Sequence, residues 1–157
     1  MKLKNNKKIL VVYIAFTLTF IDQVIKQCIV NNLYNDQKNL ITGFINLTYV
    51  ENTGGAFGIG KNSVLLFIIV NIIIIGLLIK LLLTKKGETI SAFVLSISLI
   101  ISGGLGNLID RVFRGYVIDY IDINPLFRYP IFNFADICVV IGVGILIIDL
   151  IINKDKS

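Results

Sequence analysis

Four long apolar runs constrain this chain more than any other feature of its sequence. They cover about residues 9–30, 64–83, 89–109 and 137–152. A helix needs about 20 apolar residues to cross roughly 30 Å of membrane hydrocarbon, so each run is predicted to be a transmembrane helix. Hydrophobic residues make up 55% of the chain, above the roughly 45–50% of soluble domains. We therefore predict one all-α membrane domain over residues 1–157, with outer loops at about 31–63 and 112–136.

Lysine is concentrated at particular ends of these runs. Nine lysines lie before the first run, at or after the end of the second, or after the fourth: Lys2, Lys4, Lys7, Lys8, Lys80, Lys85, Lys86, Lys154 and Lys156. The two longer connections contain few basic residues: Lys38, Lys61, Arg114 and Arg128. Segments rich in Lys and Arg stay in the cytoplasm, so we expect both termini inside and both long loops outside. This pattern explains the net charge of +5, and no nucleic-acid partner is expected.

The first run resembles a secretory signal in having lysines before an apolar core. No A-x-A-like cleavage site follows the core, however, and the later part of the run contains Asp22 and Lys26 instead. We therefore expect a retained anchor.

Histidine is absent from the sequence. This excludes a Ser-His rhomboid-type protease and an H-E-x-x-H metalloprotease. Cys28 and Cys138 both lie in apolar runs, where free cysteines behave as small hydrophobes. We therefore expect no metal and no cofactor.

The outer loops have compositions typical of ordered structure. Residues 40–50 are rich in β-branched and aromatic types and precede a cluster of glycines, which predicts a short β element on the membrane surface. Residues 112–134 contain seven Phe or Tyr residues, as expected of a segment lying in the membrane interface.

Charged residues inside apolar runs are costly, at about 2.5–3.5 kcal/mol each at the membrane centre. Asp22 and Lys26 are four residues apart in the first run, so they share a helical face and can pair. One interpretation is a local ion pair that eases insertion into the membrane. The other is a role in an active site, and the two are compatible.

The third run ends in G-G-L-G-N-L-I-D-R, residues 103–111. Gly103, Asn107 and Arg111 recur every four residues and share one helical face, with Gly106 and Asp110 beside it. Small residues let a helix or a substrate backbone approach closely. The Arg111 guanidinium is a strong donor to carbonyls or carboxylates, and Asp110 could orient it. Helix packing with an interface anchor explains the glycines well but the polar cluster poorly.

Two aspartates flank the last outer segment. Asp119 lies in V-I-D-Y, and Asp136 lies in F-N-F-A-D, 17 residues later and just before the fourth run. A loop of this length can fold back and bring the carboxyl groups together. One carboxylate could then activate water, while the other, still protonated, polarises a carbonyl and protonates the leaving amine. Alternatively, Asp119 and Asp122 are solvated and Asp136 caps a helix; the spacing alone leaves both open.

Five motifs in order resemble lipoprotein signal peptidase, the type II signal peptidase of bacteria. They are D-x-x-x-K (Asp22, Lys26), N-x-G-x-A-F (Asn52, Gly54, Ala56, Phe57), G-G-x-G-N-x-x-D-R (Gly103 to Arg111), V-x-D (Val117, Asp119) and F-N-x-A-D (Phe132, Asn133, Ala135, Asp136). Each motif alone is weak, but five in order on a chain with four apolar runs are specific. The one departure is Tyr120, where the motif often has phenylalanine.

The resemblance implies an aspartic endopeptidase of the bacterial cytoplasmic (inner) membrane. Such an enzyme removes signal peptides from diacylglyceryl-modified prolipoproteins, on the amino side of the lipidated cysteine. It also implies a small extracytoplasmic β-cradle and a short interfacial helix, with the active site at the extracytoplasmic face. We expect a monomer whose partners are these substrates and membrane lipid.

The same resemblance implies roles for individual residues. Asp119 and Asp136 would form the catalytic pair. Substrate binding or support of this pair would involve the other polar motif positions and one glycine: Asp22, Lys26, Asn52, Gly54, Asn107, Asp110, Arg111 and Asn133.

Other classes of protein remain as alternatives. A small transporter or channel subunit could use Asp22, Lys26 and Asp110 as an ion relay, although their clustering toward one face disfavours conduction. A non-enzymatic assembly factor could bind partners through the outer loops. A presenilin-type protease needs G-x-G-D, where this chain has G-L-G-N at residues 104–107. A Ser-Lys hydrolase would have to use Ser102 and Lys26.

Overall fold

The computed structural model describes residues 2–34, 36–55, 59–84, 92–124 and 128–154, with side chains from residue 7 to residue 152. The start of the third helix, expected at residue 89, lies outside these ranges. So do five residues named above: Ala56, Phe57, Lys85, Lys86 and Lys156.

The four apolar runs form four α-helices, as predicted. They are α1 (Lys2–Leu33), α2 (Val64–Thr84), α3 (Ala92–Arg114) and α4 (Phe134–Lys154), and each contains a stretch long and apolar enough to cross a membrane. The helices extend beyond the predicted ends because helical backbone continues into polar flanking residues. At 1.5 Å per residue, α1 is about 48 Å long, so it exceeds the hydrocarbon thickness of a membrane.

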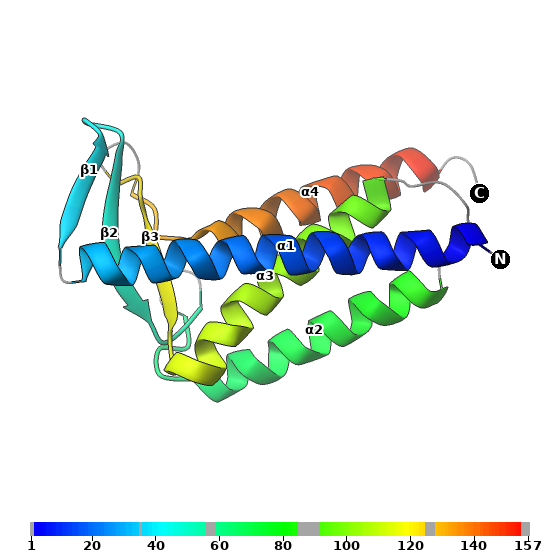
Figure 1. Cartoon of the computed structure of the whole chain (residues 1–157), viewed down its shortest axis with the longest axis horizontal. Coiled ribbons are helices and arrows are strands. Elements are labelled where there is room, and N and C mark those ends of the chain that lie inside the picture. The colour runs from blue at the N-terminus through cyan, green and yellow to red at the C-terminus, as the bar shows by residue number, and fades with distance from the viewer. Residues whose placement is uncertain (1, 35, 56–58, 85–91, 125–127, 155–157) are drawn as a thin grey trace.

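A three-stranded antiparallel sheet lies at one end of the helices (Figure 1). Its strands are β1 (Gln37–Ile41), β2 (Ile45–Asn52) and β3 (Val117–Asp122), in that order across the sheet. The hairpin between β1 and β2 contains Gly43, whose φ of 77° suits glycine far better than other residues. The predicted β element over residues 40–50 is thus confirmed, and it is the centre of a larger sheet.

The segment after α3 differs from the interfacial helix that the resemblance implied. Residues 117–122 form β3, and the described part of 115–133 contains no separate helix. The sequence V-I-D-Y-I-D is rich in β-branched and aromatic types, which favour a strand when a partner edge is available. Phe132 then pairs with Ile121, and this pairing returns the chain from β3 to the start of α4.

Helix α3 is the centre of the bundle, with α1, α2 and α4 packed around it. Glycines allow its close contact with α4. A Cβ at Gly103 would collide with the Ala135 carbonyl oxygen, and a Cβ at Gly142 would lie 2.8–2.9 Å from Ile100, Leu99 and Ser96. The small residues therefore let two backbones meet, as is typical of membrane helices.

This packing predicts that replacing two glycines of α4, Gly142 and Gly144, has different effects on stability. Gly142→Ala should lower the free energy of unfolding by about 1–3 kcal/mol, because the added methyl overpacks the α3–α4 contact. Gly144→Ala is the matched control, because nothing lies within 4 Å of a Cβ there. Thermal unfolding of both variants in detergent measures the difference. Equal midpoints for the two variants would contradict the close contact.

Candidate active site

A buried ion cluster joins α1 to α3 just beneath the sheet. The Lys26 ammonium lies 2.9 Å from Asp22 and 2.8 Å from Asp110, and it also donates to the Asn107 side-chain oxygen at 3.0 Å. Lys26 and Asp110 are 0% exposed and Asp22 is 1% exposed. All three N–H bonds of the ammonium thus have acceptors, which a charge buried among membrane helices requires. The predicted pairing of Asp22 with Lys26 is confirmed.

Asp110 does not orient Arg111, contrary to the expectation from the sequence. Its carboxylate pairs with Lys26 and, at 3.4 Å, with Arg114, and it accepts a hydrogen bond from the Ile118 backbone N–H. Adjacent residues on a helix point about 100° apart. Asp110 therefore faces α1 and β3, whereas Arg111 faces the loop after β2.

Two asparagines connect the ion cluster to the two aspartates of the predicted pair. Asn107 accepts hydrogen bonds from Lys26 and from the Asn133 side chain, and its own NH2 group donates to Asp136 at 2.8 Å. The Asn133 side-chain NH2 group also donates to Asp119 at 2.7 Å. Asp119 and Asp136 are therefore neighbours in one hydrogen-bonded network, although they come from a strand and a helix.

The N-terminus of α4 positions Asp136. Asn133 is the N-cap: its side-chain oxygen accepts from the Asp136 N–H at 2.9 Å, and the Asp136 carboxylate accepts from the Asn133 N–H at 3.1 Å. This reciprocal pair has the geometry of a capping box. The next free N–H groups, of Phe134 and Ala135, donate to the Tyr120 hydroxyl and to Asp22. Elements β3 and α1 thus hold the start of α4 in place.

Asp119 lies on β3, beside Val50 of β2 in the sheet register. Each of its carboxylate oxygens accepts one amide hydrogen bond, from Asn52 at 2.8 Å and from Asn133 at 2.7 Å. It is only 3% exposed, whereas Asp136 is half-buried. Burial, and then the charge of Asp136, raises the pKa of Asp119 to about 7, and the two amide hydrogen bonds oppose this rise.

The loop after β2 connects Asp119 to Arg111. Asn52 accepts a hydrogen bond from the Gly54 N–H, and Arg111 donates to the Gly54 carbonyl oxygen at 2.9 Å. The guanidinium stacks 5.1 Å from the centre of the Phe67 ring of α2. Its Nε–H is buried without a hydrogen-bond partner among the described residues. Gly54 is required because a Cβ there would lie 2.9 Å from the Ile59 carbonyl oxygen.

The polar site residues that the resemblance implies all meet in this network, but the sequence interpretation missed three of its members. Gln23 donates to Asp22, Asp110 and the Gly106 carbonyl oxygen; its place next to Asp22 was an available signal. Tyr120 is in the sequence only a departure from the motif, and in the structure its hydroxyl accepts a hydrogen bond from the Phe134 N–H at the start of α4. Phe67 is one apolar residue in an apolar run and gave no signal.

The chemistry available here is that of carboxylates and amides. In the part of the chain that the structure describes, His, Cys, Asp and Glu side chains form no group of three that could hold a metal ion. A buried carboxyl with a pKa near neutrality beside a more accessible carboxylate is suited to general acid–base catalysis.

The ion cluster predicts a large effect of removing its cation. Lys26→Met should lower the free energy of unfolding by about 3–5 kcal/mol, because two buried carboxylates lose their partner. Lys38→Met, at an exposed site on β1, is the control and should change little. Adding Asp110→Asn to Lys26→Met should recover part of the loss in thermal unfolding. A Lys26→Met variant as stable as the parent would contradict this role.

Known proteins resemble this chain over nearly its whole length. The family model for signal peptidase (SPase) II matches residues 14–152. The lipoprotein signal peptidase of Clostridioides difficile strain 630 is 40% identical over 149 residues, or 94% of this chain and 99% of the relative. The lipoprotein signal peptidase of Streptococcus thermophilus strain CNRZ 1066 is 37% identical over 152 residues, or 96% of this chain and 97% of the relative. The solved structure of a bacterial membrane enzyme matches this structure with a TM-score of 0.84 at 35% sequence identity. The match covers 94% of this chain and 90% of the other chain. The chain therefore belongs to the signal peptidase II family.

Proposed function

We propose that this protein is an aspartic endopeptidase that removes signal peptides from diacylglyceryl-modified prolipoproteins, cutting on the amino side of the lipidated cysteine. Its relatives are named lipoprotein signal peptidases. The observation that carries the proposed mechanism is that Asn133 contacts both aspartates. Its side chain donates to Asp119, and it exchanges two hydrogen bonds with Asp136.

The two aspartates have different environments, and these suggest different roles. Asp119 is buried with a pKa of about 7, so near neutral pH it holds a proton readily and can donate it to the scissile carbonyl oxygen. Asp136 is half-buried and therefore the more accessible carboxylate. As the base, Asp136 would take a proton from water while the hydroxyl oxygen adds to the carbonyl carbon. The tetrahedral diol then collapses, the C–N bond breaks, Asp136 gives its proton to the leaving amine, and Asp119 recovers its own.

The remaining polar residues would bind substrate or hold the pair in place. Asn52, Asn107 and Asn133 fix the directions of the carboxyl groups through the bonds described above. Asp22, Lys26 and Asp110 support Asn107 and the start of α4. The unpartnered Nε–H of Arg111 is a donor that a peptide carbonyl of the substrate could use.

The site lies at the sheet end of the helices, opposite the end where α1 begins and α4 ends (Figure 1). The excess of lysine at that opposite end supports a cytoplasmic location for both termini. The site would then face the extracytoplasmic side, near the membrane boundary. A diacylglyceryl group anchors the substrate's cleavage point at the same depth, so the substrate would arrive by lateral diffusion.

Removing either carboxyl group tests the catalytic pair. Asp119→Asn and Asp136→Asn should each lower kcat by at least about 10³-fold, because an amide can neither take up nor release the proton. Cleavage of a diacylglyceryl-modified lipobox peptide by the purified protein measures this effect. The unlipidated peptide should remain uncut.

Asp122→Asn is the matched control. Asp122 lies on the same strand, and its carboxylate bonds to Asn124 instead of to the network. This variant should keep most of the activity. Near-normal turnover by either Asp119→Asn or Asp136→Asn would overturn the assignment of the pair.

The raised pKa of Asp119 predicts how the rate depends on pH. Since its pKa is raised from 3.8 to about 7, Asp119 is protonated below that pH and loses its proton above it. The rate of cleavage should therefore fall as pH rises above about 7. A rate that stays constant or increases up to about pH 9 would show that Asp119 is not the acid.

The raised pKa of Asp119 also makes the free energy of unfolding depend on pH. Between about pH 4 and pH 7 the folded protein holds the Asp119 proton and the unfolded chain has released it, so stability falls as pH rises through this window. The thermal midpoint should fall less over that range in Asp119→Asn. If the thermal midpoints of the parent protein and Asp119→Asn changed equally with pH, this would contradict the raised pKa of Asp119.

A further inference from the structure

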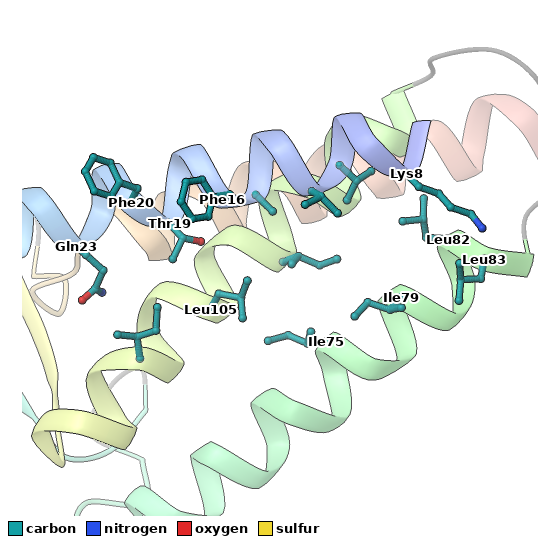
Figure 2. A pocket seen from close by; sticks show the side chains of 15 residues that line it. Lys8, Phe16, Thr19, Phe20, Gln23, Ile75, Ile79, Leu82, Leu83 and Leu105 are labelled. Atoms are coloured by element: carbon teal, nitrogen blue, oxygen red, sulfur yellow. The ribbon is translucent and has the colours of Figure 1, made fainter. Parts of the chain in front are cut away.

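A groove of about 680 Å³ lies between α1 and α2, with α3 as its floor (Figure 2). It exists because α1 and α2 both pack against α3 and hardly touch each other. Its lining is apolar except for Lys8, Thr19 and Gln23. Thr19 and Gln23 already donate to backbone carbonyl oxygens of α3, so Lys8 is the polar group that remains for a ligand.

The groove is separate from the candidate active site except at Gln23, which lines it and also donates to Asp22 and Asp110. Ile101, Leu105 and Ile109 of α3 line it, whereas Asn107 and Arg111 of α3 face the two aspartates and the loop after β2. Leu105 and Asn107 are two residues apart, which is roughly 200° around a helix. A peptide that reaches Asp119 and Asp136 therefore lies on the other face of α3.

A basic side chain, Lys8, lies at the end of the groove farthest from the sheet. Figure 2 shows the Lys8 side chain at this end, near Leu82 and Leu83 of α2. Four of the first eight residues are lysines, and no acidic residue precedes Asp22. Within the described part of the chain, Lys8 makes no ion pair. An anionic group would therefore be favoured here, by about 1 kcal/mol per lysine at a membrane surface.

The length of the groove fits a lipid chain. Lys8 and Gln23 are 15 residues apart on α1, which is about 22 Å along the helix. Half of the membrane hydrocarbon is roughly 15 Å thick, so an acyl chain can lie along the groove from a headgroup beside Lys8. We propose that the groove binds an anionic phospholipid, with its phosphate at Lys8 and an acyl chain between α1 and α2.

Lipid binding to the purified, delipidated protein in detergent tests this site. Native mass spectrometry should show tighter binding of phosphatidylglycerol than of phosphatidylcholine with the same acyl chains. Lys8→Gln should weaken the binding of phosphatidylglycerol about fivefold, in line with the loss of one lysine, and remove most of the preference. Lys61→Gln, an exposed lysine near the sheet, is the control and should bind as the parent does.

Filling the groove is the second test. Leu105→Trp and Ile79→Trp should each prevent binding of the anionic lipid, whereas Val140→Trp, at an exposed site on α4, should not. Two variants that fill the groove are used so that the misfolding of one of them does not decide the result. Thermal unfolding shows whether each variant is folded. Equal affinity for the two lipids, or binding that survives both filling variants in folded protein, would overturn the proposal.

A third outcome separates this lipid from the substrate. If an uncleaved, apolar signal-peptide helix displaces phosphatidylglycerol from the parent protein, the groove belongs to the substrate and the lipid proposal fails. If the helix binds without displacing the lipid, the proposal is supported. These assays measure binding and not cleavage, so they are independent of the proposed peptidase activity.

Discussion

The buried cation Lys26 is the interaction on which the rest of this structure depends. A charge among membrane helices needs partners, and its three acceptors come from two helices: Asp22 of α1, and Asn107 and Asp110 of α3. Asn107 then bonds to Asp136, while Asp22 bonds to the start of α4. The need to neutralise one buried charge thereby sets the distance between helices. The positions of the two candidate catalytic carboxyl groups follow from that distance.

Helix α3 separates two kinds of environment. One face has glycines and polar side chains, where α4 approaches closely and where Asn107 and Arg111 meet the outer loops. The opposite face has Ile101, Leu105 and Ile109 and borders the apolar groove. This arrangement keeps polar groups away from lipid along most of the helix. It also allows peptide chemistry at the sheet end and lipid contact at the lysine-rich end to occupy separate surfaces.

The sequence predicts the helices and the main members of the site well, because the signals are strong and local. Apolar runs of sufficient length define α1 to α4, and the four-residue spacing of Asp22 and Lys26 predicts their pairing. The predictions that were wrong or missing concern contacts between segments that are far apart in the chain. The sequence suggests Arg111 as the partner of Asp110, but the choice between Arg111 and Lys26 depends on where α1 lies. Residues 117–122 form a strand because β2 offers an edge, and the Tyr120 hydroxyl has a partner only because α4 begins beside it.

We propose that Asp119 and Asp136 act as an unequal pair, in which Asp119 carries a proton up to about pH 7. Infrared difference spectroscopy of the membrane-embedded protein measures this directly, through the carbonyl stretch of a protonated carboxyl group. We expect a band that disappears as pH rises through about 7, in keeping with the raised pKa of Asp119, and that is absent from Asp119→Asn. A band that persists in Asp119→Asn, or a carboxyl group already ionised at about pH 5, would contradict it.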